Sequence, residues 1–267
     1  MTDFLHSFAP WSLSKSDLAA KCPYAFKLRY LDKVARREGK EAKIGTAAHT
    51  VQELILRGED PRIALQAAFD EMPQLLEEER AVVEELLPAY TAFYERMQRF
   101  KDRYPIRAEY FEQEWAVNEN FEAVPYDSPE AFFRGIVDYA LVTEQNYLIV
   151  IDHKSGKRKP VSNYANQLDS YAVLGLAVHP ELTGVHAALH YMKAKELDWH
   201  TLRRAHEIRS MLKSYTRDFL RKRAEKLEGY PTQTSPLCKW CDYLQNCPTG
   251  NEYLVQAKSL KRSKKSS

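Results

Sequence analysis

Hydrophobic residues recur with a helical period through the first third of the chain. With Ser, Pro and Gly at its boundaries, the pattern predicts helices over residues 14–31, 45–56, 61–68 and 75–104. Ser14 or Ser16 is expected to cap the first helix, and the charged segment 34–43 is expected to be a loop. The chain therefore begins with a helical region.

After residue 108, polar and apolar residues alternate or apolar residues form short runs, and both patterns are typical of strands. The predicted strands cover 109–117, 132–142, 147–152 and 185–193, and helices return over 164–178 and 202–227. Neither an internal repeat nor a low-complexity linker interrupts this order. We therefore expect an α/β fold in which helices flank a small central mixed sheet, without a regular βαβ array.

Two carboxylates lie in strands that are otherwise apolar. Residues 133–142 are apolar on both strand faces, so this strand should lie inside the sheet, with Asp138 paired or bound to a metal. The next strand ends in Asp152-His153-Lys154, where alternation directs Asp152 and Lys154 to one face and His153 to the other. The hairpin between the strands would bring Asp138 beside Asp152. Two carboxylates and an ammonium group are therefore expected at one edge of the sheet.

This trio has the composition of a site for metal-dependent phosphodiester hydrolysis. Two carboxylates can hold Mg²⁺ or Mn²⁺, and the metal polarises the phosphoryl oxygen and lowers the pKa of bound water. The lysine would orient that water or offset the charge that develops on phosphorus. An Asp-x-Lys sequence is also common as a simple ion pair at a strand end, so the trio alone leaves both interpretations open.

Two further segments contribute polar residues. His49 follows the small-residue segment 45–48, whose short side chains allow another element to approach closely. Gln167 and Tyr171 are four residues apart and share one face of a predicted helix. Taken separately, a lone histidine on a helix is more often a packed core residue than a ligand, and the Gln–Tyr pair fits ordinary packing.

Taken together, these segments carry a family resemblance. In chain order they are Gly45-Thr46-Ala47-Ala48-His49, Gly135-Ile136-Val137-Asp138, Asp152-His153-Lys154 and Gln167-Leu168-Asp169-Ser170-Tyr171. This ordered set resembles the PD-(D/E)XK nuclease superfamily, and most resembles the branch of the RecB and AddB nuclease domains and the CRISPR-associated RecB-like exonucleases. The resemblance implies a restriction-endonuclease-like core around the small sheet.

The resemblance also implies roles for individual residues. The implied metal ligands are three side chains and one backbone carbonyl, namely His49, Asp138, Asp152 and the carbonyl of His153. Lys154 would be the catalytic lysine, and Gln167 and Tyr171 would contact DNA phosphates or support that lysine. Because one ligand is an imidazole, Mn²⁺ is as suitable as Mg²⁺.

Two neighbouring positions bear on the resemblance. Glu114, on the strand before the hairpin, occupies a position that is often acidic in this branch, and we expect it to support the ligands rather than to bind the metal. Val137 stands before Asp138 where the superfamily name has proline, which is the usual variant in this branch.

The four cysteines indicate a second metal site. Cys238, Cys241 and Cys247 form a C-x2-C-x5-C pattern, and the remaining cysteine is Cys22. Disulfides are unexpected in a cytoplasmic chain, and four thiolates suit either zinc or an iron–sulfur cluster. One cysteine far upstream of a C-terminal triplet resembles the iron–sulfur staple of the same nuclease branch, which implies a [4Fe-4S] cluster on all four. Metal bonds that close so long a loop would stabilise the fold.

Composition excludes several classes of protein. The 267 residues include nine glycines but neither G-x-G-x-x-G nor G-K-[ST], so a dinucleotide-binding loop and a Walker-type phosphate cradle are excluded. No apolar run approaches the roughly 18 residues of a membrane span, and the N-terminus lacks a signal-peptide pattern. We therefore predict a cytoplasmic protein of a bacterial, archaeal or phage-infected cell, with no membrane partner.

The formal net charge of +2 conceals an uneven distribution. Residues 1–257 carry 34 Lys and Arg against 37 Asp and Glu, whereas residues 258–267 hold five basic residues and no acid. Residues 70–85 hold seven acids and one base, and residues 193–226 hold eleven bases and five acids. Charge runs are usually solvated faces, but this segregation permits a polyanion-binding surface. The basic helix 202–227 is the candidate for phosphate contact, and the basic tail is expected to be disordered.

These observations predict a single nuclease domain over residues 1–257, with its catalytic core over about 106–195. The expected function is a metal-dependent exonuclease acting on single-stranded DNA or duplex ends in replication, recombination or repair, and any helicase or recombination partner would be a separate protein. Two alternatives stay open. A noncatalytic DNA-end-binding or adaptor subunit would be expected to lose part of the Asp138, Asp152 and Lys154 set, and a small-molecule metalloenzyme would require a closed apolar pocket.

Overall fold

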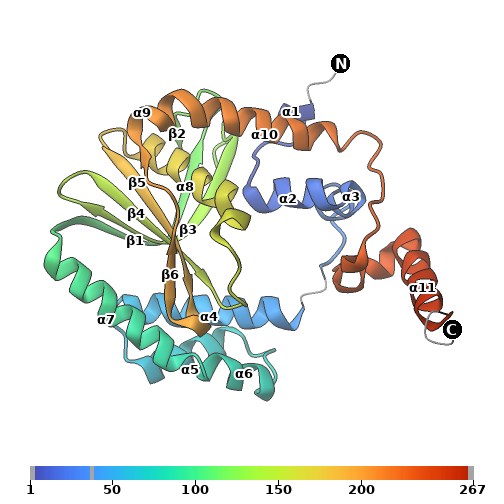
Figure 1. Cartoon of the computed structure of the whole chain (residues 1–267), viewed down its shortest axis with the longest axis horizontal. Helices are drawn as coiled ribbons and strands as arrows, with labels where there is room; N and C mark the ends of the chain where they lie inside the picture. Colours follow the sequence, from blue (N-terminus) through green and yellow to red (C-terminus); the bar gives the residue numbers. More distant parts are fainter. Residues whose placement is uncertain (1–3, 37–38, 264–267) are drawn as a thin grey trace. The chain divides into compact units, whose positions relative to one another are not determined.

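The computed structural model describes residues 4–36 and 39–263, and the chain divides into two compact units (Figure 1). Unit 2 is formed by residues 40–216, and unit 1 is formed by the segments on either side, 1–39 and 217–267, as far as they are described. Among the described residues, no helix combines the length and the hydropathy needed to cross a membrane. The single domain expected from the sequence stays a prediction.

Unit 2 is built on a seven-stranded mixed sheet. Its strands are β1 (Ile106–Val117), β2 (Ala123–Val124), β3 (Phe133–Thr143), β4 (Tyr147–Lys154), β5 (Gly184–Tyr191), β6 (Glu196–Trp199) and β7 (Arg203–Arg204). Their order is β2-β1-β3-β4-β5-β6, and β7 also pairs with β5. Only the β4–β5 pair is parallel among the strand pairs of the described residues. The predicted mixed central sheet, with the two apolar strands in its interior, is confirmed.

Helices cover both faces of this sheet. They are α4 (Lys40–Leu56), α5 (Pro61–Glu71), α6 (Glu77–Glu84), α7 (Leu87–Arg103), α8 (Ala165–Val178) and α9 (Ala205–Glu207), with a π-helical segment at Ile208–Leu212 and the start of α10 (Lys213–Glu225). Helices α4 and α7 lie on one face of the sheet and α8 on the other (Figure 1). A Cβ atom on Gly175 would lie 2.2 Å from Leu148 Cδ2, so glycine lets α8 pack this closely on β4.

Unit 1 contains short helices and a small aromatic core. Its helices are α1 (Phe4–Ser7), α2 (Leu13–Lys21), α3 (Pro23–Tyr30) and α11 (Pro248–Ser263), together with the C-terminal part of α10. The ring of Phe8 lies 5.3 Å from that of Phe26 and 6.2 Å from that of Trp11. All four cysteines belong to this unit.

Several element boundaries differ from the prediction. The helix predicted over 14–31 is divided into α2 and α3 at Pro23, which cannot donate the backbone hydrogen bond of a continuing helix, and Ser12 rather than Ser14 or Ser16 caps α2. The helix predicted over 75–104 is divided into α6 and α7, and the loop predicted over 34–43 ends where α4 begins at Lys40.

The basic C-terminal part of the chain also differs in detail. Strand β7 and the π-helical segment interrupt the continuous helix predicted over 202–227. Helix α11 extends through residues 258–263, which the sequence analysis assigned to a disordered tail. Residues 264–267 of that tail lie outside the described residues.

Candidate active site

The site begins where the antiparallel pairing of β3 and β4 ends. The last paired residues are Tyr139 and Ile151. Beyond them, the backbone N–H of His153 donates to Asp138 Oδ2 at 2.7 Å instead of to a strand carbonyl. The Asp138 side chain thereby satisfies a backbone donor at the end of β4, and the hydrogen bond fixes its carboxylate beside Asp152 and Lys154.

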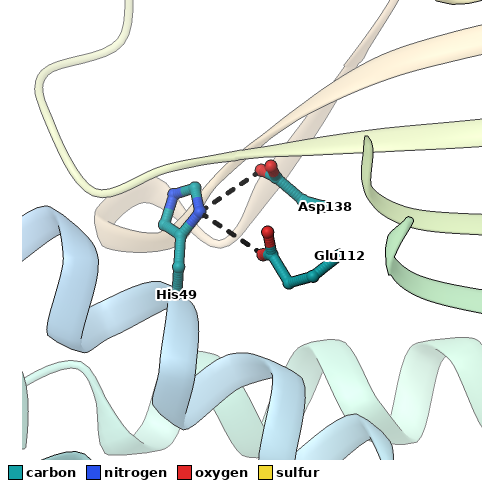
Figure 2. A group of neighbouring side chains, drawn as sticks. All are labelled: His49, Glu112 and Asp138. Carbon is teal, nitrogen blue, oxygen red and sulfur yellow. Dashed lines mark ion pairs between the residues drawn. The ribbon is translucent and has the colours of Figure 1, made fainter. Parts of the chain in front are cut away.

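His49 reaches this point from α4. A Cβ atom on Gly45 would lie 3.6 Å from Ser155 Oγ, so the small-residue segment passes close to the residue after Lys154, as predicted. His49 Nε2 lies 3.0 Å from the carbonyl oxygen of His153. Its Nδ1 lies 3.5 Å from Asp138 Oδ2 and 4.0 Å from Glu112 Oε1 (Figure 2).

These distances define a cation-binding geometry. If Nε2–H donates to the carbonyl, the neutral imidazole directs the Nδ1 lone pair at two carboxylate oxygens, an arrangement that requires a proton or a metal ion between them. Ligand atoms of His49, Glu112 and Asp138 all lie within 4.8 Å of one another. Imidazole and carboxylate together suit Mn²⁺ and related divalent metals.

Electrostatics support the same assignment. Burial raises the pKa of Glu112 to about 7, and the negative charge of Asp138 acts in the same direction. Burial, together with the charge of Asp152, also raises the pKa of Asp138 well above the ordinary range of a carboxyl group. Carboxylates that repel one another in a partly dry site become favourable once a cation is shared between them.

Glu112 occupies this position because β1 reverses its faces there. Alternation should place residues five apart on opposite faces of a strand. The rings of Tyr110 and Trp115 nevertheless lie 6.2 Å apart, and both lie near His179, at 5.4 and 6.1 Å. Between them, Glu112 has a φ of 44°, in the left-handed region that non-glycine residues rarely adopt. This backbone reversal turns Glu112 toward the metal-ligand cluster, whereas Glu114 is exposed.

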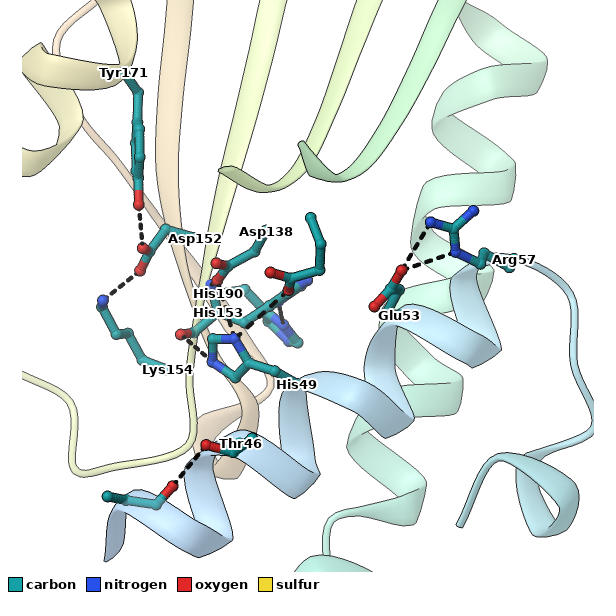
Figure 3. A network of polar contacts seen from close by, with 12 residues as sticks. Thr46, His49, Glu53, Arg57, Asp138, Asp152, His153, Lys154, Tyr171 and His190 are labelled. Carbon is teal, nitrogen blue, oxygen red and sulfur yellow. Dashed lines mark hydrogen bonds and ion pairs between the residues drawn. The ribbon is translucent and has the colours of Figure 1, made fainter. Parts of the chain in front are cut away.

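On the α8 side of β4, a second polar group surrounds Asp152. Its Oδ1 accepts hydrogen bonds from Gln167 Nε2 at 2.8 Å and from Tyr171 OH at 2.9 Å. Lys154 Nζ lies 2.5 Å from Asp152 Oδ2 and donates to Gln167 Oε1 at 3.2 Å. Figure 3 shows Tyr171, Asp152 and Lys154 on one side of the β4 end and His49 on the other. Gln167 and Tyr171 therefore hold Asp152 and Lys154 in place.

Lys154 is a cation in this setting. Burial lowers the pKa of its ammonium group, but the adjacent Asp152 carboxylate, together with Asp138, raises it, and the resulting pKa is above its ordinary value. A permanently protonated lysine cannot act as a general base near neutral pH. Its chemical use is to donate hydrogen bonds and to stabilise negative charge.

Behind the site, two buried histidines meet. His153 Nδ1 and His190 Nδ1 lie 2.9 Å apart, and the ring of His190 stacks on Phe93 of α7 with centroids 4.0 Å apart. Burial lowers the pKa of His190 to about 3 and the pKa of His153 well below its ordinary range, so both rings are neutral near pH 7. His153 therefore faces the α7 side of the sheet, opposite to Asp152 and Lys154, as alternation predicted.

The structure brings together the residues that the sequence analysis selected for this site, namely His49, Asp138, Asp152, the carbonyl of His153, Lys154, Gln167 and Tyr171. It corrects the expectation for Glu114, since Glu112 is the acidic residue of β1 beside His49 and Asp138. The contact of His190 with His153 was not predicted from the sequence. The position of His190 at the end of a predicted apolar strand was the available signal.

Replacing Glu112 with glutamine should weaken Mn²⁺ binding by about 10-fold or more, because one anionic oxygen is removed from the cluster. Glu114→Gln serves as the matched control and should leave the Mn²⁺ dissociation constant unchanged. Isothermal titration of the purified variants measures both constants. Equal Mn²⁺ affinities for Glu112→Gln and the unsubstituted protein would exclude Glu112 from the metal site.

Thermal stability should depend jointly on pH and metal. Because the folded metal-free protein holds the Glu112 proton to about pH 7, whereas an unfolded glutamate releases it near 4.5, stability should fall as pH rises through this window. Bound Mn²⁺ requires the ionised carboxylate and offsets this loss. The increase in Tm on adding Mn²⁺ should therefore be larger at pH 8 than at pH 5, as measured by differential scanning fluorimetry. An equal increase at both pH values would contradict the linkage.

Comparison with known proteins gives one family match and lists similarities to two solved structures. A family model described as the PD-(D/E)XK nuclease superfamily matches residues 10–248. A candidate exonuclease from Eubacterium rectale is 11% identical, with 84% of this chain and 89% of that chain covered and a TM-score of 0.45. The protein SSO0001 is 12% identical, with 94% and 96% covered and a TM-score of 0.37. No curated protein matches the chain significantly.

Proposed function

The chain belongs to the PD-(D/E)XK nuclease superfamily, and from this premise we propose that it is a metal-dependent DNA exonuclease that hydrolyses phosphodiester bonds at single-stranded or frayed ends. One observation carries the proposal above all others. His49, Asp138, Asp152 and Lys154, drawn from three separate elements, converge at one edge of the sheet with Gln167 and Tyr171 holding them in place.

The residues present suit a divalent metal ion. His49 Nδ1 lies 3.5 Å from Asp138 Oδ2 and 4.0 Å from Glu112 Oε1, and Lys154 Nζ, at 2.5 Å, is the ion-pair partner of the buried Asp152 Oδ2. Carboxylates that lie close together in a partly buried site are costly unless a cation is shared between them. His49, Asp138 and Glu112, whose ligand atoms lie within 4.8 Å of one another, would hold Mg²⁺ or Mn²⁺, and Asp152 and the carbonyl of His153 would complete the ligand set.

When bound, the metal would polarise the phosphoryl group and lower the pKa of a water molecule. The protein side chains supply the rest of the chemistry. Lys154, held as a cation by Asp152, would donate to a phosphate oxygen and offset the charge that develops as water attacks phosphorus. The new bond joins the water oxygen to phosphorus, the bond to the leaving sugar oxygen breaks, and that oxygen takes up a proton.

Activity tests this proposal directly. The purified protein should release nucleotides from end-labelled DNA in the presence of Mn²⁺ or Mg²⁺ and should be inactive in EDTA. Asp152→Asn should abolish the release, whereas Asp70→Asn, the same exchange at an exposed aspartate of α5, should not. DNA binding without any metal-dependent cleavage would instead indicate a noncatalytic end-binding subunit. A helicase or recombination partner would be a separate chain.

We further propose that the four cysteines hold a [4Fe-4S] cluster. Cys22, Cys238, Cys241 and Cys247 line one hollow of about 380 Å³ within unit 1. Backbone N–H groups already point at two of the sulfurs, since Ser235 N donates to Cys238 Sγ and Gly250 N to Cys247 Sγ, each at 3.3 Å. Such hydrogen bonds stabilise thiolates and tune clusters.

Sulfur spacing favours a cluster over a single zinc ion. Thiolates at about 2.3 Å from one zinc ion lie roughly 3.8 Å from one another in a tetrahedron. Within the described chain, no three cysteine sulfurs lie within 4.8 Å of one another. Burial raises the pKa of Cys241, and the neighbouring Cys22 and Cys238 act in the same direction, so a bound metal centre, whether iron or zinc, would be needed to hold these groups as thiolates.

A further inference from the structure

A groove on the α7 side of unit 2 has the composition of a nucleic-acid contact. The C-terminal half of α7 and the edge strand β6 enclose a hollow of about 250 Å³. Arg96, Arg99 and Arg103 line it from the helix, and Trp199 lines it from the strand. Among the described residues, none of those lining it is acidic.

The three arginines form one row. Their spacing of three and four residues places them on the same face of α7, and all three are exposed. Arg99 has a partner in Glu95 at 3.8 Å. Arg96 and Arg103 have no carboxylate partner among the described residues. The row therefore keeps an uncompensated positive charge suited to an anion.

Trp199 supplies an aromatic surface beside this charge. Its side chain is 44% exposed. The ring of His186 supports it edge-on, with centroids 6.2 Å apart at an interplanar angle of 89°. A large aromatic residue that is held in place and half exposed is a suitable platform for a nucleobase, because every base has a face that can stack.

The groove lies on the α7 face of the sheet, opposite to the side chains of Asp152 and Lys154, and close to them in position along the strands. Trp199 pairs with Ala188, which pairs with Ile151, so Trp199 is level with the residue before Asp152, about 10 Å away across two strand spacings. A neighbouring hollow shares Trp199 and is lined by Arg158 and by Lys159, from the loop that follows Lys154.

This loop is fastened to the same edge of the sheet. Arg158 Nε donates to Asp198 Oδ2 of β6 at 2.8 Å, and Tyr191 OH donates to the carbonyl oxygen of Lys159 at 2.7 Å. Because Arg158 is paired with Asp198 and Glu196, the basic and aromatic groups that continue from the α7 row toward the segment that carries Lys154 are Lys159 and Trp199.

We propose that this groove binds the single-stranded part of a nucleic-acid substrate, with a base stacked on Trp199 and phosphates paired with Arg96 and Arg103. This proposal depends on the proposed function, because it assigns the surface along which the substrate strand would lie. A single strand fits better than a duplex, because bases inside a duplex are covered by their neighbours and cannot offer a face to Trp199.

Fluorescence anisotropy with a labelled oligothymidylate, in EDTA so that no cleavage occurs, tests the stacking. Trp199→Ala should raise Kd about 5- to 100-fold, the range expected for one lost base–aromatic contact. Trp199→Phe should keep most of the affinity and controls for folding. An unchanged Kd for Trp199→Ala would overturn the proposal, as would an equal loss for blunt duplex DNA.

Salt dependence tests the arginine row. Arg96→Ala and Arg103→Ala should each lower the magnitude of the slope of log Kd against log salt by about 0.7, the value for one phosphate contact on a single strand. Arg62→Ala on α5 is the matched control and should leave the slope unchanged. If Arg96→Ala and Arg103→Ala leave the salt dependence of Kd unchanged, these arginines do not contact phosphates of the bound strand.

One experiment distinguishes failure of the groove proposal from failure of the proposed nuclease function. The same oligonucleotide is incubated with Mn²⁺ and the unsubstituted protein. Cleavage together with an unaltered Kd for Trp199→Ala would retain the nuclease and reject the groove. Absence of cleavage together with a raised Kd for Trp199→Ala would reject the nuclease and support the groove as a binding site.

Discussion

Replacing Lys154 with methionine is expected to slow phosphodiester hydrolysis by about 10²- to 10⁴-fold, because the substitution removes the ammonium group that would donate to the phosphate oxygen on which negative charge develops. Methionine preserves much of the aliphatic length, so packing beside Tyr164, whose ring centroid lies 4.9 Å from Lys154 Nζ, should survive. Single-turnover rates on end-labelled DNA in Mn²⁺ measure the effect.

The same variant should not bind metal more weakly. Loss of the ammonium group removes a positive charge 2.5 Å from Asp152 Oδ2, so the Mn²⁺ dissociation constant should stay equal or decrease. Lys157→Met, three residues along in the exposed loop, makes the same change of charge without touching Asp152 and should retain the hydrolysis rate. A Lys154→Met rate within threefold of the unsubstituted protein would disprove the catalytic assignment.

Replacing Cys247 with serine is expected to remove bound iron and sulfide and to lower the Tm of the protein by about 10 °C or more. Cys247 is the most buried of the four cysteines, and its Sγ already accepts the Gly250 N–H. Its loss would break the cross-link that the proposed cluster would form between Cys22 and the C-terminal triplet, and so between the two segments of unit 1. Iron and sulfide analysis of anaerobically purified protein, visible absorption and calorimetry measure the outcome.

Leu237→Ser is the control for this experiment. Leu237 is 61% exposed beside Cys238, so its substitution perturbs the same turn while all four thiols remain. It should leave the iron content unchanged. A colourless unsubstituted protein carrying one equivalent of zinc would refute the iron–sulfur cluster and would leave the nuclease proposal intact.

The elements that sequence periodicity could predict are those with long or strongly apolar patterns. Residues 139–143 of β3 and 148–153 of β4 are all buried, and the 14 residues of α8 carry a continuous apolar stripe, so each of these elements has a clear sequence pattern. Strands β2, β6 and β7 have two, four and two residues, which is too short for any period to appear. Pro23 is the sequence signal for the division between α2 and α3, although the predicted helix 14–31 continues through it.

The candidate site was predictable as far as regular geometry governs it. Alternation along β4 was enough to separate Asp152 and Lys154 from His153, and helical spacing was enough to pair Gln167 with Tyr171. The position of Glu112 could not be predicted, because no sequence pattern marks a glutamate with left-handed backbone inside a strand. This conformation also reverses which face of β1 the following residues occupy, so simple alternation gives the wrong face for them. The exposed position of Trp199 could not be predicted either, because it depends on the pairing of β6 with β5, and no local sequence pattern indicates that pairing.

The way in which the chain divides into its two units has a consequence for biosynthesis. Residues 40–216 form unit 2 without interruption, whereas unit 1 requires segments from both sides of it. During translation, every residue of the candidate active site, from His49 to Tyr171, leaves the ribosome before Cys238 has been added. Since domains generally fold as units in the order of their synthesis, the catalytic unit should be complete first. The cysteine site can be assembled only afterwards, so each new molecule should pass through a stage in which the residues of the candidate active site are in place and the proposed cluster cannot yet be bound.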